Sequence, residues 1–324
     1  MSVLLIAPYP EQRRRELEQL LGPVHYYPWT ELGRARTGTE LLELLQRIDA
    51  RAVIVELDEV TEEVIADHPL DFIGVCRATP VNVAVQAASK RAIPVFRTIG
   101  RNVQAVVELV IGTIITMLRH VRQSETWLKG ENWIDQFGPY LQFQGSELHG
   151  KKVGVIGLGA VGKRIAKLLE AFSCEIVYYD PYVEQSEVPA YQALPLEDLL
   201  AKSDIVTVHL PSLPETHGLL SLTLLAHLQP HALFVNTSRS SVVDNDALYE
   251  LLSNKQIAGA ILDVFDAEPP GPREHALIQL DNVLATPHIA GASHDVYHHH
   301  AAIMNEQIIA WLKQSQVETA EPIS

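Results

Sequence analysis

A glycine-rich loop near the middle of the chain has the residue types and the spacing of a dinucleotide-binding turn. The loop follows the apolar segment Lys152–Ile156 and opens an amphipathic pattern over Ala160–Phe172. In the pattern Gly-x-Gly-x-x-Gly the first glycine allows a tight turn, the second lets the backbone approach a pyrophosphate, and the third lets the helix pack close to the sheet. The helix N-terminus offers free N–H groups and a positive dipole to phosphates. The predicted contacts are Gly157, Gly159, Ala160, Val161 and Gly162.

The next predicted strand is followed by an acidic residue that distinguishes two dinucleotides. Asp180 comes directly after the apolar segment Glu175–Tyr179. A carboxylate at this place accepts hydrogen bonds from the ribose hydroxyls and repels a 2′-phosphate. Pro181 and Tyr182, which come next, supply no positive charge for such a phosphate. The sequence therefore predicts NAD as the cofactor.

Length, composition and charge are those of an ordinary globular protein with two domains. The chain has 324 residues, of which 47% are hydrophobic and 20% are charged, and this length exceeds what one core usually serves. The formal net charge of −15 disfavours a nucleic acid or an anionic membrane surface as a partner. An anionic substrate therefore needs a locally positive site.

The sequence favours a cytoplasmic protein. Its first residues lack the basic region and the long apolar core of a signal peptide, and no apolar run approaches the ~20 residues that span a bilayer. The two cysteines, Cys76 and Cys174, have no metal-ligand spacing and are expected to be buried free thiols in a reducing compartment.

Short apolar runs alternate with helical patterns almost throughout the chain. This alternation is typical of parallel sheets covered by helices, so we expect an α/β fold with two doubly wound, Rossmann-like sheets. Amphipathic helices are expected at Glu11–Leu21 and Glu40–Ile48. The expected strands are Val3–Ala7, Ala52–Val55, Phe72–Val75, Ile93–Phe96, Lys152–Ile156, Glu175–Tyr179, Ile205–His209, Ala232–Asn236, Ala258–Leu262 and Val283–Ala285.

Three segments depart from this alternation. A long apolar stretch from Val103 to about Val121 predicts a buried helix. Residues 122–150 have less pattern but several aromatic side chains, so we expect a wrapping loop or a partner-contacting arm. A final helix is expected from about Ser293 to Lys313, before a frayed tail at Val317–Ser324.

Beyond Asp180 the chain resembles the D-isomer-specific 2-hydroxyacid dehydrogenase family, which includes the phosphoglycerate dehydrogenases. The resemblance runs from about Val75 to Trp311. It rests on Val208-His209-Leu210-Pro211 with Thr216, on Val235-Asn236-Thr237-Ser238-Arg239, on Leu262-Asp263-Val264-Phe265 with Glu268-Pro269-Pro270, and on Thr286-Pro287-His288-Ile289-Ala290-Gly291. It implies a homodimer, and a cleft between a flavodoxin-like substrate domain (residues 1–98 with 295–324) and an NAD-binding Rossmann domain (residues 99–294).

The resemblance assigns the catalytic positions to Arg239, Glu268 and His288, and the chemistry of a D-2-hydroxy acid asks for the same residue types. Removing a hydride from C2 requires a base for the hydroxyl proton, and a histidine titrates near neutrality. A carboxylate beside it orients the ring and favours its charged form. A guanidinium can hold the substrate carboxylate and polarise the C2 oxygen. We therefore expect oxidation of a small anionic 2-hydroxy acid by NAD, or reduction of the matching 2-oxo acid.

The same resemblance implies further contacts. Asp263 would face the nicotinamide carboxamide, and Ala78 and Thr79 would offer backbone N–H groups to the substrate carboxylate. Arg101 would reach the cleft or form a structural ion pair. The other implied cofactor contacts are His209, Leu210, Pro211, Thr216, Thr237, Ser238 and His288, and the other implied substrate contacts are Arg77 and Arg239.

The chain departs from the family's pattern at positions that bear on the substrate. Ser240 stands where glycine usually follows the catalytic arginine, and Ile99 stands where proline is usual before Gly100. Ala78 and Thr79 stand where glycine is common. These departures leave the hydride chemistry intact and the identity of the 2-hydroxy acid open.

Other interpretations of the same residues remain. An NAD(H)-sensing binding protein, similar to the C-terminal-binding-protein corepressors, could share this scaffold because those proteins keep the arginine, glutamate and histidine. A formate dehydrogenase would carry glutamine where this chain has Glu268. The run His298-His299-His300 suggests a metal ligand set, but successive residues of a helix point about 100° apart. We expect a surface or interface helix there, and no metal.

Overall fold

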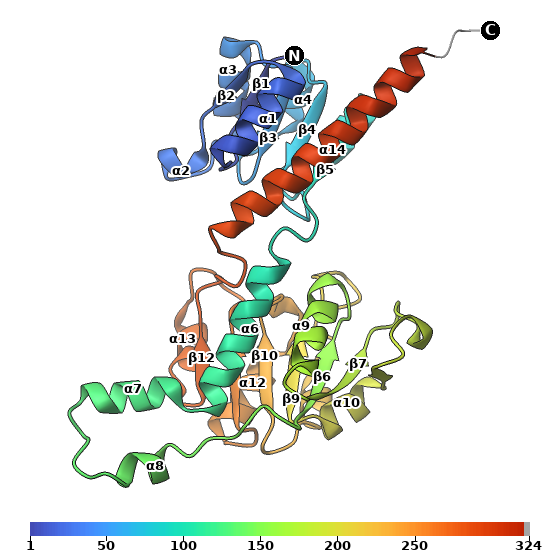
Figure 1. Cartoon of the computed structure of the whole chain (residues 1–324). Coiled ribbons are helices and arrows are strands. Elements are labelled where there is room, and N and C mark those ends of the chain that lie inside the picture. Colours follow the sequence, from blue (N-terminus) through green and yellow to red (C-terminus); the bar gives the residue numbers. More distant parts are fainter. Residues whose placement is uncertain (321–324) are drawn as a thin grey trace. The chain divides into compact units, whose positions relative to one another are not determined.

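The computed structural model describes residues 1–320, with side chains as far as Gln314. The chain forms two compact units, each built on its own parallel sheet (Figure 1). Unit 1 contains Met1–Asn102 and the chain from Ser293 onwards, and unit 2 contains Val103–Ala292. Parallel sheets covered by helices confirm the predicted α/β fold of Rossmann-like architecture.

The sheet of unit 1 has five parallel strands in the order β2-β1-β3-β4-β5, which is the flavodoxin-like order of a doubly wound sheet. The edge strand β2 is missing from the expected strands because its three half-buried residues give no apolar run. The strands are β1 Val3–Leu5, β2 Val24–Tyr26, β3 Ala52–Val55, β4 Phe72–Val75 and β5 Val95–Arg97.

Helices cover both faces of this sheet because alternate strand residues point to opposite sides. Val53 and Ile73 pack with the α3, α4 and α5 side, whereas Ile54 and Phe72 pack with α1 and α14. The helices are α1 Glu11–Leu21, α2 Trp29–Leu32, α3 Gly38–Ile48, α4 Glu62–Asp67, α5 Val85–Lys90 and α14 Asp295–Ala320.

The sheet of unit 2 has seven parallel strands in the order β12-β11-β10-β9-β6-β7-β8. The direction of chain progression reverses between the neighbours β6 and β9, and ligands of open α/β sheets bind outside the carboxyl ends of the strands at such a point. The strands are β6 Lys152–Ile156, β7 Glu175–Tyr179, β8 Gln192–Ala193, β9 Ile205–Val208, β10 Leu233–Asn236, β11 Gly259–Leu262 and β12 Val283–Ala285.

Two hydrophobic cores flank this sheet. Val155 and Val235 face the core formed with α6 and α9, and Val208 and Phe234 face the core formed with α10, α11, α12 and α13. These helices are α6 Val103–Leu118, α9 Ala160–Glu170, α10 Leu196–Lys202, α11 Leu222–Leu225, α12 Asn245–Ser253 and α13 Pro272–Ile278. The sheet is thereby held rigid beneath the loops at its carboxyl edge.

The segment 122–150 was expected to be a wrapping loop or a partner-contacting arm, and it is partly helical. It contains two helices, α7 Val121–Lys129 and α8 Gly138–Gln142, which stand away from the body of unit 2 (Figure 1). We call this segment the arm. Its exposed large apolar side chains are Leu128, Trp133, Ile134, Phe137, Tyr140 and Leu141.

Other differences from the sequence-based expectations are small. Helix α14 continues to Ala320, past the expected end at Lys313 and into the segment expected to be frayed, of which residues 321–324 lie outside the described part. Cys76 is a buried free thiol as expected, but Cys174 is only half-buried. Among the described residues, no single helix has the length and hydropathy to cross a membrane, and α6 with α7 passes that test only as a pair bent by 62°.

Candidate active site

The glycine loop between β6 and α9 has a geometry that only glycine tolerates at two positions. Gly157 has φ +90°, and a Cβ there would lie 2.8 Å from the carbonyl oxygen of His209. A Cβ on Gly162 would lie 2.1 Å from the carbonyl oxygen of Gly157. A Cβ on Gly159 would meet no protein atom within 4 Å. The backbone at Gly159 is therefore open to a ligand, at the N-terminus of an eleven-residue helix.

Asp180, directly after β7, is hydrogen-bonded to the backbone of the glycine loop. Its Oδ2 accepts a hydrogen bond from the Leu158 N–H at 2.7 Å, and its Oδ1 accepts one from the Tyr182 N–H at 2.9 Å. A carboxylate has about four acceptor positions, so Asp180 keeps capacity for ribose hydroxyls. The same carboxylate also fixes the conformation of the glycine loop.

The loop after β9 lies beside the glycine loop at His209 and Leu210. The predicted cofactor contacts of His209, Leu210 and Pro211 stay predictions. Nε2 of His209 lies 2.8 Å from the Thr207 hydroxyl, and burial lowers the pKa of His209 to about 3, so the ring is neutral. The Thr216 hydroxyl donates to the Pro211 carbonyl at 2.6 Å and accepts from the Leu213 N–H at 2.9 Å. In this structure Thr216 braces the loop, and its cofactor contact stays a prediction.

The donors present fit a dinucleotide. The hydroxyl of Thr237, at the end of β10, is buried without a hydrogen-bond partner among the described residues. A buried unpaired hydroxyl is unfavourable, and a ligand at this edge of the sheet would satisfy it. With the open backbone at Gly159 and the acceptor at Asp180, three independent features of unit 2 suit a dinucleotide.

A histidine and a carboxylate meet at the carboxyl ends of β11 and β12. Nδ1 of His288 lies 2.6 Å from Oε2 of Glu268, and the side chains are 49% and 38% exposed. The His288 backbone has φ +54°, a region that non-glycine residues seldom adopt and that concentrates at functional sites. The pair is thus held together in the protein and open to a ligand.

Asp263 holds the loop that carries His288. Its side chain is fully buried, and Oδ1 accepts hydrogen bonds from the Thr286 hydroxyl at 2.6 Å and the Ile289 N–H at 2.8 Å. Oδ2 accepts from the Ala290 N–H at 2.8 Å. The contact predicted between Asp263 and the carboxamide stays a prediction; its observed partners show a role in positioning.

Arg239 extends from the neighbouring loop, after β10. Asn236, at the end of that strand, donates through Nδ2 to the Arg239 carbonyl at 3.0 Å and accepts from the Ser238 N–H at 3.0 Å. The Arg239 guanidinium is exposed and donates to the Ser238 carbonyl at 2.6 Å. Because β10, β11 and β12 are neighbours in the sheet, the loops with Arg239, Glu268 and His288 are neighbours too.

Asn236 and Thr286 are the positioning residues that sequence reasoning passed over. Both lie inside motifs of the resemblance, Asn236 three residues before Arg239 and Thr286 two residues before His288. The signal was therefore present, but side-chain chemistry alone does not say which motif member touches a ligand and which supports its neighbour.

The predicted substrate loop of unit 1 follows β4. Ala78 and Thr79 are exposed, and neither of their N–H groups has a backbone acceptor within the described part of the chain. Arg77 is half-buried. These N–H groups are free to bind an anion, which is the role that the resemblance implies.

Arg101 forms the structural ion pair that the sequence leaves as one of two possibilities. Its Nη1 lies 2.5 Å from Oε1 of Glu56, and the side chains are 17% and 7% exposed. The other Glu56 oxygen accepts from Trp29 Nε1 at 2.9 Å. Nη1 of Arg101 is already engaged by Glu56. A contact between Arg101 and a substrate would therefore have to be made in addition to this ion pair.

The histidine run at the start of α14 points three ways. His298 is exposed, Nδ1 of His299 lies 3.1 Å from the Arg101 carbonyl, and His300 is fully buried with Nε2 2.6 Å from the Pro8 carbonyl. The three rings point in different directions, and the surface or interface helix expected here is wrong for His300, which is buried inside unit 1. Within the described residues no group of three metal-ligating side chains is arranged around one point.

The buried His300 should make unit 1 less stable in acid. Burial lowers the pKa of His300 to about 4, below that of an unfolded histidine, so the unfolded state binds the proton more tightly and stability falls as pH falls below about 6.5. Between about pH 7 and pH 5 the expected loss is roughly 2 kcal/mol. Hydrogen exchange of the β1 and β3 amides measures it, and His300→Gln, which keeps a donor for Pro8, should lose that part of the pH dependence. Equal pH dependence in both proteins would contradict the assignment.

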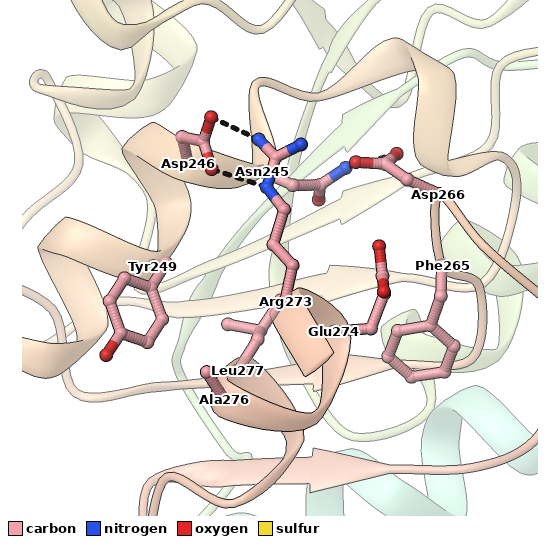
Figure 2. A pocket seen from close by; sticks show the side chains of 9 residues that line it. All are labelled: Asn245, Asp246, Tyr249, Phe265, Asp266, Arg273, Glu274, Ala276 and Leu277. Carbon is pink, nitrogen blue, oxygen red and sulfur yellow. Dashed lines mark hydrogen bonds and ion pairs between the residues drawn. The ribbon is translucent and has the colours of Figure 1, made fainter. Parts of the chain in front are cut away.

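Unit 2 also has a pocket that the predicted site residues do not line. It encloses about 240 Å³ between α12, α13 and the loop after β11. Figure 2 shows the Asp246–Arg273 ion pair on one side, Phe265 on the other, and Asn245 and Asp266 at the rim. Phe265 and Asp266 belong to the loop that carries Glu268, so the pocket and the candidate site share this loop.

Comparison with known proteins agrees with this geometry. Residues 111–290 match the NAD binding domain of the D-isomer specific 2-hydroxyacid dehydrogenases. The chain is 51% identical over 313 residues to YoaD of Bacillus subtilis (strain 168), which is named as a 2-hydroxyacid dehydrogenase, covering 96% of this chain and 91% of that protein. It is 34% identical over 290 residues to the D-3-phosphoglycerate dehydrogenase of Archaeoglobus fulgidus, covering 88% of this chain.

The relatives were also compared with this chain in length and in fold. The match spans 54% of the length of the Archaeoglobus protein, so about half of that relative has no counterpart in the alignment. The solved structure of D-2-hydroxyisocaproate dehydrogenase superposes with a TM-score of 0.83 over 97% of this chain and 98% of that chain, at 19% identity, which establishes the shared fold. The corepressor-like alternative finds no support in these relatives. The chain thus belongs to the D-isomer specific 2-hydroxyacid dehydrogenase family and is an NAD-dependent oxidoreductase.

Proposed function

We propose that the chain interconverts a D-2-hydroxy acid and its 2-oxo acid, with His288 as the general acid and base, Glu268 as its orienting partner and Arg239 as the substrate-binding cation. The observation that carries the proposal is the 2.6 Å contact between His288 Nδ1 and Glu268 Oε2. Together with the half-exposed ring it gives a histidine whose second nitrogen is available to a ligand.

The proton path follows from which nitrogen is engaged. Because Nδ1 donates to Glu268, Nε2 is the nitrogen that exchanges a proton with the substrate oxygen. In the reducing direction Nε2 gives its proton to the C2 carbonyl oxygen, and in the oxidising direction it accepts the hydroxyl proton. The bound cofactor would supply the hydride to C2 as NADH in the reducing direction and accept it from C2 as NAD⁺ in the oxidising direction. Glu268 stabilises the charge that the ring carries before each proton donation.

The guanidinium of Arg239 supplies the local positive charge that an acidic protein needs for an anionic substrate. Its two-pronged donor geometry suits a carboxylate together with the C2 oxygen. We propose that the free N–H groups of Ala78 and Thr79, with Arg77 in the same loop, also bind the substrate carboxylate. Unit 1 would then be the substrate domain and unit 2 the NAD-binding domain.

A panel of 2-oxo acids tests the substrate class. Purified protein is mixed with NADH and with glyoxylate, pyruvate, hydroxypyruvate, phosphohydroxypyruvate or a branched 2-oxo acid, and the loss of NADH absorbance is followed. We expect turnover with at least one of these and, for Arg239→Ala, a rise in KM for that acid with NADH affinity unchanged. Turnover by Arg239→Ala with an unchanged KM would exclude Arg239 as the substrate-binding cation.

Asp180 should determine the preference for NAD over NADP. Its carboxylate repels a 2′-phosphate, so Asp180→Asn, which keeps an acceptor for the Leu158 N–H, should raise kcat/KM for NADPH while lowering that for NADH. We expect the NADH-to-NADPH ratio to fall by about tenfold, one lost charge interaction of about 1.4 kcal/mol. A ratio equal to that of the wild type would show that another group makes the selection.

We also propose that the chain is a homodimer and that the arm covers a second copy. Ile134 is 92% exposed and Tyr140 72% exposed, and monomeric proteins seldom leave such a cluster in water. Ile134→Asp with Phe137→Ser should convert the dimer to a monomer in light scattering after size exclusion, because both changes remove apolar area. Leu20→Asp, an exposed leucine of α1, is the matched control. A wild-type monomer, or a dimer that survives both changes, would rule out the arm as the interface.

A cytoplasmic location is proposed on the chemistry of the thiols. Cys76 and Cys174 are both free, and burial raises the pKa of the Cys76 thiol well above its usual range. Free thiols are typical of proteins kept in a reducing compartment.

A further inference from the structure

A buried hydroxyl beside Arg239 joins the loop after β10 to the loop after β11. Ser240 is 8% exposed, and its Oγ donates to Oδ1 of Asp266 at 2.5 Å. Nδ2 of Asn245, the first residue of α12, lies 2.8 Å from both Ser240 Oγ and Asp266 Oδ1. These three side chains form a closed triangle of hydrogen bonds, which we call the Ser240 clamp. Figure 2 shows Asn245 and Asp266 with their polar ends directed at each other.

The clamp adjoins the groups that the proposed reaction uses. Ser240 directly follows Arg239, and Asp266 lies two residues before Glu268. The Phe265 N–H, next to Asp266, donates to Oε1 of Glu268 at 3.1 Å. The other oxygen of Glu268 binds His288. A shift of the clamp therefore moves Arg239 on one side and the Glu268–His288 pair on the other.

The clamp has a buried hydroxyl, on Ser240, and an exposed carboxylate, on Asp266. A hydroxyl that donates to a carboxylate makes a short, charge-assisted hydrogen bond, and Ser240 is protected from competing water by its burial. Asn245 anchors both partners to the start of α12, which packs on the sheet through Leu248 and Leu252. A glycine at position 240 would leave Asp266 bonded to Asn245 alone.

Resting on the proposed function, we propose that the Ser240 clamp positions the Arg239 guanidinium at a set distance from the Glu268–His288 pair. Arg239 is exposed and long, so its backbone must be fixed if the guanidinium is to meet both the carboxylate and the C2 oxygen. Catalytic groups have to be held within roughly 0.5 Å of the productive geometry. Ser240 is thus a positioning residue, which touches neither substrate nor cofactor.

The first test separates the clamp from general stability. Ser240→Ala should lower kcat/KM for the 2-oxo acid about tenfold, by raising KM and lowering kcat together, with the dissociation constant of NADH unchanged. Ser241→Ala is the matched control, because Ser241 Oγ contacts Ser212 Oγ at 2.9 Å and lies outside the clamp; it should retain wild-type values. Equal values for the two variants, or a loss of NADH binding in Ser240→Ala, would overturn the proposal.

The second test asks whether Ser240 acts through Arg239. In an Arg239→Lys background, where the two-pronged contact is already lost, Ser240→Ala should reduce kcat/KM further by less than about twofold, because coupled residues are not additive. Asp266→Ala should reproduce the effect of Ser240→Ala, and the double variant should be no worse than either. A full additional tenfold loss in the lysine background would overturn the clamp. Wild-type turnover by Arg239→Lys itself would contradict the proposed role of Arg239, a different result.

Discussion

Replacing His288 by alanine will lower kcat for the 2-oxo acid by about 10²- to 10⁴-fold, the usual contribution of general acid–base catalysis. The side chain is 49% exposed, so its removal leaves little cavity and the fold should persist. His288 is also an implied cofactor contact, but the glycine loop that would bind the pyrophosphate is unchanged in this variant, so NADH binding should weaken far less than kcat falls. Stopped-flow turnover, together with NADH fluorescence titration, measures both quantities on one preparation.

The chain offers a matched control for this variant. His231 Nε2 and Asp204 Oδ1 form a second histidine–carboxylate pair in unit 2, at 2.8 Å, with His231 60% exposed. His231→Ala should leave kcat unchanged, because this pair lies at the other end of the sheet, before β9 and β10. Turnover by His288→Ala within about threefold of the wild type would eliminate His288 as the acid and base, since one proton-transfer group accounts for far more than that.

Of two single-methyl substitutions in the glycine loop, only one should destabilise the unliganded protein. A Cβ on Gly162 would lie 2.1 Å from the Gly157 carbonyl oxygen, whereas a Cβ on Gly159 meets no protein atom within 4 Å. Gly162→Ala should therefore cost about 1–3 kcal/mol of the unfolding free energy of unit 2, as overpacking does, and should lose NADH binding with it. Gly159→Ala should unfold as the wild type does but bind NADH at least about tenfold more weakly, because the methyl occupies the space of the pyrophosphate.

Thermal unfolding without cofactor and fluorescence titration with NADH measure the two effects. The comparison is internally controlled, since both variants add the same methyl group within one loop. Wild-type NADH affinity in Gly159→Ala would mean that the pyrophosphate does not lie over this backbone, and an unchanged melting temperature in Gly162→Ala would mean that the helix can move away from the loop.

The parts of the fold that the sequence predicts well are buried on both sides. β3, β4, β6, β7 and β12 have the expected bounds because parallel strands covered by helices are continuous apolar runs. The edge strands β2 and β8 are half-buried or exposed, so their sequences carry no such signal. The edge strand β12 does carry it, because Val283 and Leu284 are buried. The arm was expected to be a wrapping loop or a partner-contacting arm, and its helices α7 and α8 were not predicted because its large apolar side chains are exposed and follow no helical pattern of burial.

In the candidate site, the sequence predicts the reactive residues better than the hydrogen bonds that position them. Side-chain type and motif order predict His288, Glu268 and Arg239 as the reactive set, and the structure brings His288 and Glu268 into contact. The bond between Ser240 and Asp266 joins residues 26 positions apart. Such a bond depends on how two loops leave neighbouring strands, which neither periodicity nor motif spacing encodes. The supporting partners of Asp263 are hidden from the sequence for the same reason.

The most direct test of the proposed reaction is the position and configuration at which the hydride of NADH enters the product. NADH carrying deuterium at the transferred position of the nicotinamide is incubated with the preferred 2-oxo acid, and the product is analysed by mass spectrometry and chiral chromatography. Hydride transfer to C2 with His288 as the acid predicts one deuterium at C2 of a 2-hydroxy acid of D configuration, formed in step with NADH consumption and lost in His288→Ala. An L product, or a product without deuterium at C2, would contradict it.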